Sequence, residues 1–325
     1  MSVKSKGLTV PDKNAADGAN RGIRKYIRHN WQLWIMLFPA MLYILIFCYV
    51  PMYGIQLAFR EYSFTAGITG GKFVGMKYFR QYFESPMFWT TLKNTFVISA
   101  TSILVGFPVP IILAMVINQI RSPKWKRTVQ TTVYIPYFIS VVVLVSMLNI
   151  MFANDSGVIA NFLKSLHIVS RDTNILGKES CFVPLYVLSG VWQTMGWNSI
   201  IFIAALSSVD TQLYDACKID GANRWQKMFF ITLPSISSSI IVMLIISIGN
   251  IFSVDLDRIL LMYNPSVYET ADVIQTYVYR IAFQATGFPN YSYGTAVNML
   301  KSIIAFVLVI AANKLASKYS ETRLF

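Results

Sequence analysis

The side chains best suited to ligand binding in this 325-residue chain lie on one long apolar segment, residues 182–206. Trp192, Gln193, Trp197 and Asn198 follow one another there, and a helix would place Gln193 beside Trp197 and near Asn198 on one face. Aromatic rings stack on sugar rings and amides hydrogen-bond hydroxyl groups, so the pattern is typical of a carbohydrate passage. Contacts between packed helices use the same residue types, and the sequence leaves both interpretations open.

Three more polar side chains within apolar segments are candidates for the same path, namely Asn250, Asn298 and Lys301. Polar groups inside a bilayer are costly, and they either pair with one another or line a path. Lys301 would favour acidic sugars if it faces that path, although it begins only about 10 Å below the predicted outer surface and could snorkel there. Asp255 and Asp257 follow the segment that contains Asn250, and we expect them to be loop or interface charges.

The sequence offers little for catalysis. The two histidines, His29 and His167, lie away from the middle of the apolar segments, and those segments hold almost no acidic residues for a proton relay. The three cysteines have neither metal-ligand spacing nor an even number for a disulfide framework. The stretch GITGGKF, residues 67–73, superficially resembles a phosphate-binding loop, but Ala66 stands where the first glycine must be and Phe73 replaces the Ser or Thr that would hold magnesium. We therefore expect no catalytic residue, metal, cofactor or nucleotide-hydrolysing site in this chain.

Composition places the chain in a membrane. It is 55% hydrophobic and only 13% charged, with a mean hydropathy of +0.51, which is too apolar for an ordinary soluble domain. A spanning helix needs roughly 20 mainly apolar residues. Six segments qualify, so the sequence predicts an all-α membrane protein with six transmembrane helices, at approximately residues 31–59, 90–118, 128–152, 182–206, 235–252 and 294–316.

The distribution of charge predicts the orientation of these helices. The net charge of +13 could indicate nucleic-acid binding, but the basic residues favour one side of the predicted membrane. By the positive-inside rule both termini are then cytoplasmic in a multi-pass protein of the cell membrane, although a basic first outer loop departs from the pattern. Residues 1–21 form a polar, basic tail with too little apolar surface to order, and we expect disorder there. Residues 22–325 would form the transmembrane domain.

A polar and amphipathic insert, residues 208–234, separates the fourth and fifth predicted helices. Asp210 can cap a first short helix, Asp220 can cap a second, and Gly221 allows a sharp turn between them. Apolar residues then recur at helical spacing and leave Arg224 and Lys227 off their stripe. So short a helix must bury that stripe against either the lipid interface or a groove on a partner protein; the stripe consists of Ala222, Trp225, Met228 and Phe229.

Motifs along nearly the whole chain carry a resemblance to a known family. The insert has an acidic residue at Asp215, Ala216, Gly221 and an Ile-x-Leu-Pro ending at Pro234, as does the EAA loop of ABC importer permeases. The chain resembles in particular the oligosaccharide-importer permeases of Gram-positive bacteria, in all but its N-terminal tail. The motifs that carry this resemblance are YVPMYG (49–54), VGMKYF (74–79), LKNTFVIS (92–99), QTTVYIPYFIS (130–140), GWNSIIFIAAL (196–206), VIQTYVYR (273–280) and YSYGTAV (291–297).

The resemblance implies that the insert is a cytoplasmic EAA-type coupling helix between helices four and five, docked in a cleft of an ATPase subunit. It assigns this docking to Asp215, Ala216, Gly221, Ala222, Trp225 and Pro234. Asp215 replaces the usual glutamate and Cys217 the second alanine, and because charge or small size is kept we expect altered partner preference at most.

The same resemblance implies a permease subunit of a type I ABC importer that couples ATPase closure to alternating access. The implied partners are a second homologous permease, two ATPase subunits that hold ATP and magnesium, an extracellular solute-binding lipoprotein and an oligosaccharide, besides membrane lipid and without nucleic acid. The alternative is an ion-driven secondary carrier or another integral membrane protein that does not depend on ATP.

Overall fold

The computed structural model describes residues 29–65, 67–284 and 289–319, and the predicted tail, residues 1–21, lies outside them. The described residues are mostly helical and contain two isolated β-bridges but no β-strand, which confirms the all-α class. The chain divides into two compact units, residues 1–56 and 57–325. The cavity and the insert described below lie in the second unit. The assignment of residues 22–325 to a single transmembrane domain stays a prediction.

A 29-residue helix, Trp31–Phe59, begins the described chain. It consists of α2 (Trp31–Ile44), the π-helical turn η1 (Leu45–Tyr49) and the 3-10 helix η2 (Val50–Phe59). A second π-helical turn, η4 (Met228–Thr232), lies in the insert. Each π turn is followed after one residue by a proline, Pro51 or Pro234. Proline has no N–H to donate, and its ring clashes with the carbonyl four residues earlier, so a wider turn at that place relieves the clash.

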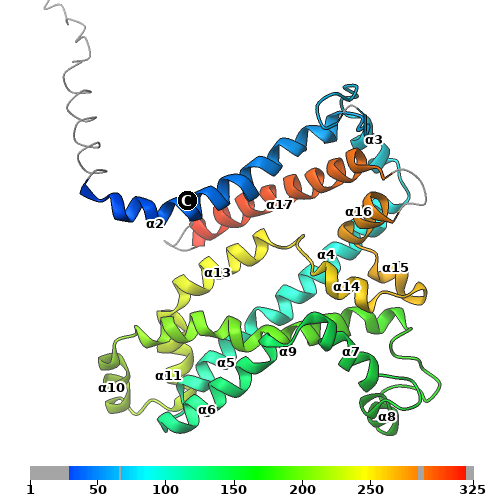
Figure 1. Cartoon of the computed structure of the whole chain (residues 1–325). Helices are drawn as coiled ribbons and strands as arrows, with labels where there is room; N and C mark the ends of the chain where they lie inside the picture. The colour runs from blue at the N-terminus through cyan, green and yellow to red at the C-terminus, as the bar shows by residue number, and fades with distance from the viewer. Residues whose placement is uncertain (1–28, 66, 285–288, 320–325) are drawn as a thin grey trace, which may run out of the picture. The chain divides into compact units, whose positions relative to one another are not determined.

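The long helix α9 (Glu179–Ser207) organises the second unit, and α4 (Met87–Gly106), α5 (Pro108–Asn118) and α6 (Pro123–Tyr134) pack against it (Figure 1). The shorter elements that precede or follow these helices are α3 (Lys77–Phe83), η3 (Ile135–Phe138), α7 (Val141–Met151), α8 (Val158–Ser165), α10 (Thr211–Ile219), α11 (Arg224–Lys227), η4 and α12 (Leu233–Ser235).

The rest of the unit consists of α13 (Ser237–Gly249), a connection with four short elements, and the terminal helix α17 (Tyr291–Tyr319). α17 packs along α13 and α16. The connection contains α14 (Leu256–Met262), η5 (Pro265–Val267), α15 (Tyr268–Ala271) and α16 (Ile274–Phe283).

Three buried apolar clusters hold these helices together. One joins α3, α16 and α17 through aromatic side chains such as Tyr82 and Tyr293. A second joins α4, α9 and α14 around Ile98 and Ile259, and a third joins α5 to α9 and the start of α13 around Phe202. Ile98 and Ile259 are completely buried, and such a side chain contributes about 1.5–3 kcal/mol to stability. The clusters place the helix ends that form the cavity and the insert.

A buried polar cluster fixes the connection between α13 and α17 to α4. Arg280 Nη2 lies 2.6 Å from Asp272 Oδ2, and the Thr276 hydroxyl donates to Asp272 Oδ1 at 2.6 Å. Asn94 of α4 donates to the Asp272 carbonyl oxygen at 3.0 Å. Burial and the nearby Asp272 carboxylate raise the pKa of Tyr263 to about 12, so its hydroxyl stays protonated and donates to that carboxylate at 3.1 Å. Every oxygen of the buried Asp272 side chain therefore has a donor.

The third predicted span, residues 128–152, is interrupted and not one continuous helix. Two helical segments, Pro123–Phe138 and Val141–Met151, meet there at 95°. Ile139 and Ser140 have extended backbones, and the Ser140 side chain caps α7 by accepting the N–H of Val143 at 3.3 Å. The apolar pattern continues through the break because it records burial from water and not backbone direction.

Length and composition qualify three helices as membrane spans, Trp31–Phe59, Met87–Asn118 and Tyr291–Leu315. Three bent pairs qualify only if each pair is one span, and these are Pro123–Phe138 with Val141–Met151, Glu179–Ser207 with Thr211–Ile219, and Arg224–Ser235 with Ser237–Gly249. The predicted number of six therefore remains the upper value and is not settled by the helices alone.

We expect Gly196→Ala to loosen the packing of α6 on α9. A methyl group at Gly196 would lie 1.9 Å from the Val133 carbonyl oxygen, and the backbone cannot move away as a side chain can. Overpacking of this kind destabilises a fold by about 2 kcal/mol. The measurement is the midpoint of thermal unfolding of the purified protein in detergent, with Gly294→Ala as the control because its new methyl group would meet neighbours at an ordinary 3.5 Å. Equal midpoints for the two variants would contradict the packing shown here.

Candidate functional site

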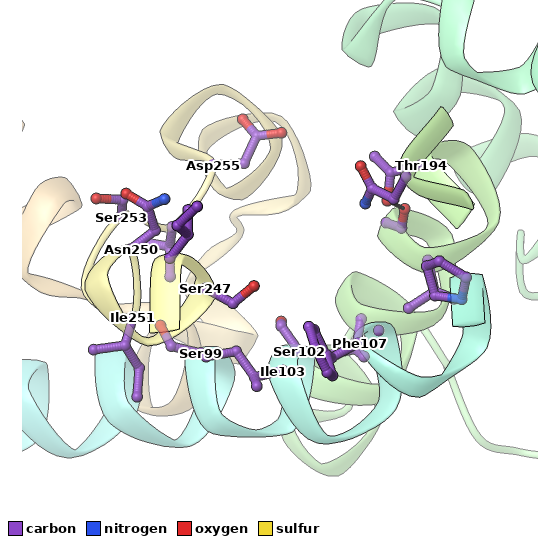
Figure 2. A pocket seen from close by; sticks show the side chains of 18 of the residues that line it. Ser99, Ser102, Ile103, Phe107, Thr194, Ser247, Asn250, Ile251, Ser253 and Asp255 are labelled. Carbon is purple, nitrogen blue, oxygen red and sulfur yellow. Dashed lines mark hydrogen bonds between the residues drawn. The ribbon is translucent and has the colours of Figure 1, made fainter. Parts of the chain in front are cut away.

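A cavity of about 500 Å³ lies in the second unit between α4, α9 and the end of α13. Figure 2 shows Thr194 of α9 facing Ser247 and Asn250 across the open space, with Ser99 and Ser102 of α4 along one side. This volume is within the range of small-ligand sites. The polar wall residues are mostly hydroxyl and amide groups, namely Ser99, Ser102, Tyr186, Thr194, Asn198, Ser247, Asn250, Ser253, Asp255 and Arg258.

Two of the seven path candidates, Asn198 and Asn250, line this cavity. Trp192 and Trp197 are 40% and 44% exposed, and neither belongs to the cavity wall. The Trp197 ring stacks on Tyr137 with centroids 4.4 Å apart and an angle of 4° between the rings. A path role for these residues stays a prediction.

The two candidates on α17, Asn298 and Lys301, are half-buried and do not belong to this cavity wall. The expectation that they face the same space as the fourth predicted span therefore has no support in this cavity. Their role in the path also stays a prediction.

Gln193 is a buried bridge between two other parts of the chain. The side chain is 6% exposed, and its Nε2 donates to the Ile139 carbonyl oxygen at 2.7 Å. That carbonyl belongs to an extended residue at the break between η3 and α7. Oε1 of Gln193 accepts a hydrogen bond from Arg258 Nη2 at 2.5 Å. Gln193 thus joins the break in the predicted third span to α14, which fits the interpretation of contacts between helices.

Arg258 is a buried cation that the sequence reading missed. Its side chain is 7% exposed, and Nη2 lies 3.4 Å from Oδ2 of Asp255. The guanidinium also lies over the Tyr186 ring, 5.6 Å from its centroid. The available signal was the three-residue spacing of Asp255 and Arg258 at the start of a helix, since Asp255 Oδ1 caps α14 by accepting the Arg258 N–H at 3.2 Å. Asp255 lies in the loop before α14, as predicted, and there it both caps that helix and belongs to the cavity wall.

The insert begins as predicted, with Asp210 Oδ1 accepting the N–H of Gln212 at 2.8 Å and capping α10. Gly221 has φ +74°, a left-handed conformation that glycine adopts without strain, so the sharp turn after α10 is confirmed. The predicted cap at Asp220 is wrong, because Asp220 ends α10 and the next helix is capped by Asn223. Asn223 Oδ1 accepts the N–H of Gln226, and Gln226 Oε1 accepts the N–H of Asn223, in a reciprocal capping box.

The apolar stripe of the insert divides between an inner and an outer side. Met228 packs against the buried cluster around Phe202, so it faces the second unit's own interior. Trp225 and Phe229 are 68% and 51% exposed and stack on each other with centroids 6.3 Å apart. Ile219 and Phe230, which the stripe did not include, are even more exposed at 87% and 78%. We call Ile219, Trp225, Phe229 and Phe230 the exposed apolar set of the insert.

The remaining docking candidates surround this set. Asp215 and Ala216 are exposed on α10, where the Asp215 carboxylate pairs with Lys218 Nζ at 2.6 Å. Ala222 is half-buried between the two helices, and Pro234 is exposed in α12. Their docking role stays a prediction.

Comparisons with known proteins identify the family. The profile of the binding-protein-dependent transport system inner membrane component matches residues 106–317. The chain therefore belongs to this family of membrane transport components, as the sequence motifs predicted.

Individual relatives extend the similarity over almost the whole chain. The chain is 38% identical to Protein LplB of Bacillus subtilis over 98% of its own length and 99% of the relative's. It is 40% identical to the polygalacturonan/rhamnogalacturonan transport system permease protein YteP of the same organism, over 90% of each chain.

A solved structure is similar in both fold and sequence. It is a bacterial alginate ABC transporter in complex with an alginate pentasaccharide-bound periplasmic protein, with a TM-score of 0.81 and 37% identity over 92% of this chain and 99% of that one. A second structure, of a bacterial ABC transporter involved in the import of the acidic polysaccharide alginate, has a TM-score of 0.80 and 36% identity over 91% and 98%. The overall path of the chain is thus that of an ABC transporter membrane subunit.

We expect Gln193→Leu to destabilise the break between η3 and α7. Leucine removes the donor to the Ile139 carbonyl oxygen and the acceptor of Arg258, and each buried group left unpaired costs about 1–3 kcal/mol. The measurement is the thermal unfolding midpoint of the purified protein. Gln119→Leu, at the exposed end of α5, is the matched control and should leave the midpoint unchanged. An unchanged midpoint in Gln193→Leu would mean that this bridge contributes nothing.

Proposed function

We propose that this chain is the transmembrane permease subunit of an ATP-driven oligosaccharide importer. The observation that carries the proposal is the similarity to the alginate ABC transporter, which extends over 92% of this chain and 99% of the other at a TM-score of 0.81. Similarity over so much of both chains favours the same role in the assembly. YteP, at 40% identity, is itself a permease protein of a polygalacturonan/rhamnogalacturonan transport system. The substrate class follows from these relatives and from a cavity rich in hydroxyl and amide groups.

In this proposal each of the three bent helix pairs contributes one span, which α9 and α13 form in the two pairs that flank the insert. This gives six transmembrane helices with both termini in the cytoplasm. The bends of 72° and 64° on either side of the insert turn α10 and α11 away from the directions of α9 and α13. The insert is then a cytoplasmic coupling helix between helices four and five. Support comes from the exposed apolar set, because aromatic side chains 51% or more exposed on short helices need a surface to cover them.

Transport would follow from a rigid-body movement and not from chemistry on this chain. Two ATPase subunits bind ATP and magnesium, close, and move the coupling helices of this chain and of a second homologous permease. That movement opens the path outward to receive the sugar from an extracellular solute-binding lipoprotein, and hydrolysis resets it. The ATPase subunit would push on the exposed apolar set, which follows the C-terminal end of α9. The cavity lies along the same helix, so a movement of α9 would reach it.

We expect Trp225→Ala to weaken the attachment of the ATPase subunit. Trp225 is 68% exposed, stacks on Phe229 and is the largest side chain of the exposed apolar set. Truncating an aromatic side chain at the centre of an interface typically lowers affinity by roughly tenfold or more. The measurements are the amount of ATPase subunit that copurifies with the tagged permease and the rate of ATP-dependent oligosaccharide uptake into proteoliposomes.

The matched control is Trp89→Ala, which removes an equally exposed tryptophan, 72%, from the start of α4 and should leave both measurements unchanged. Full copurification and normal uptake in Trp225→Ala would contradict docking at the insert and favour burial in the lipid interface. A permease that is purified without any ATPase subunit and still transports along an ion gradient would contradict the whole proposal.

A further inference from the structure

We propose that Arg258 provides a carboxylate-binding position in the cavity wall, which makes the path selective for oligosaccharides that contain uronic acids. This inference rests on the proposed function as an oligosaccharide permease. It adds a substrate class and names a specificity-determining side chain. It replaces Lys301, the cation that the sequence suggested for the same task, because Lys301 does not line the cavity.

The first argument is that the charge of Arg258 is incompletely paired. A guanidinium has five N–H donors, and buried polar groups normally find partners. The hydrogen bond and the ion pair of the Arg258 side chain both use Nη2, which reaches Gln193 at 2.5 Å and Asp255 at 3.4 Å. The second distance exceeds the 2.7–2.9 Å of a strong charge-assisted hydrogen bond. Within the described residues Nε is buried without any acceptor.

The second argument is that the structure holds this arginine in place at the wall. Its Nη1 passes Gly190 of α9 so closely that a Cβ there would lie 2.3 Å away. Tyr186, one helical turn earlier, has its ring against the guanidinium and its hydroxyl oxygen accepts the N–H of Asp255 at 2.9 Å. Gln193 holds the outer end of the side chain. Restriction of this kind reduces the entropy lost when the guanidinium binds a ligand.

The third argument is the composition of the wall around it. Asp255 and Arg258 are the charged residues that line the cavity, and the other polar groups are hydroxyls, amides and a phenol. Neutral hydroxyl and amide groups suit the hydroxyl groups of a sugar, whereas a carboxylate on the sugar needs a cation. Asp255 is loosely bound to Arg258 and about a third exposed, so it neutralises the arginine only in part. A uronate carboxylate would complete the pairing of the arginine through Nη1, because the hydrogen bond to Gln193 and the ion pair with Asp255 both use Nη2.

The experiment compares uptake of trigalacturonate with uptake of its fully methyl-esterified form, which has the same backbone without negative charge. Proteoliposomes contain the complete transporter and the same solute-binding protein throughout, so the preference of that protein cancels when a variant's uptake ratio is divided by the wild-type ratio. We expect the wild type to prefer the acid. Arg258→Gln should lower the acid-to-ester ratio by roughly tenfold, because the loss falls on the charge-assisted hydrogen bonds. Arg80→Gln, an exposed arginine of α3 that pairs with Glu84, is the matched control and should keep the wild-type ratio.

A second variant keeps the test decisive if Arg258→Gln assembles poorly. Asp255→Asn retains a residue that caps α14 well and removes the competing carboxylate, so it should raise the acid-to-ester ratio about threefold. An unchanged ratio in both variants, or an equal loss of acid and ester uptake in Arg258→Gln with an unchanged ratio in Asp255→Asn, would overturn the carboxylate position. Failure of the wild type to import either trimer with ATP would instead count against the proposed function.

Discussion

A helix that breaks inside an apolar environment leaves backbone carbonyls without donors, and this constraint shapes the centre of the structure. In water such a carbonyl is solvated, but in hydrocarbon it must find a donor within the protein. At the break between η3 and α7 the Ile139 carbonyl oxygen receives the Gln193 amide at 2.7 Å. The same amide accepts from Arg258, whose own helix α14 begins at the Asp255 cap. One side chain thus satisfies the break and ties three parts of the chain together.

The arrangement has consequences for the cavity. Gln193 points to the break between η3 and α7, whereas Thr194 and Asn198 of the same helix line the cavity. Arg258 reaches the same wall because α9 carries a glycine at residue 190, where any larger residue would collide with the guanidinium. The positive charge of Arg258 at the cavity wall is therefore held in place by contacts with Gly190, Tyr186 and Gln193. This makes Arg258 a better candidate for recognising an anionic sugar than Lys301, which does not line the cavity.

The insert differs from the cavity in that much of its apolar surface is exposed. Its two short helices are well capped, by Asp210 and by the Asn223–Gln226 pair, and its turn uses the left-handed freedom of Gly221. Met228 attaches it to the buried cluster around Phe202, while the exposed apolar set remains uncovered. The capped helices and the uncovered apolar set are the two features on which the proposed docking of the insert rests.

The sequence alone determined the features that depend on local pattern. Apolar segments predicted an all-helical membrane protein, the motifs predicted the family, and Asp210 and Gly221 gave the start and the turn of the insert. These succeeded because hydrophobic periodicity, capping and positive φ are properties of neighbouring residues. The predicted cap at Asp220 was wrong because Asn223 and Gln226 form a reciprocal pair that holds the helix start three residues later. Only the tertiary structure decided the break at Ile139, the bridging role of Gln193 and the position of Arg258, because their hydrogen bonds join residues 54 and 65 positions apart, across helices whose packing no local pattern specifies.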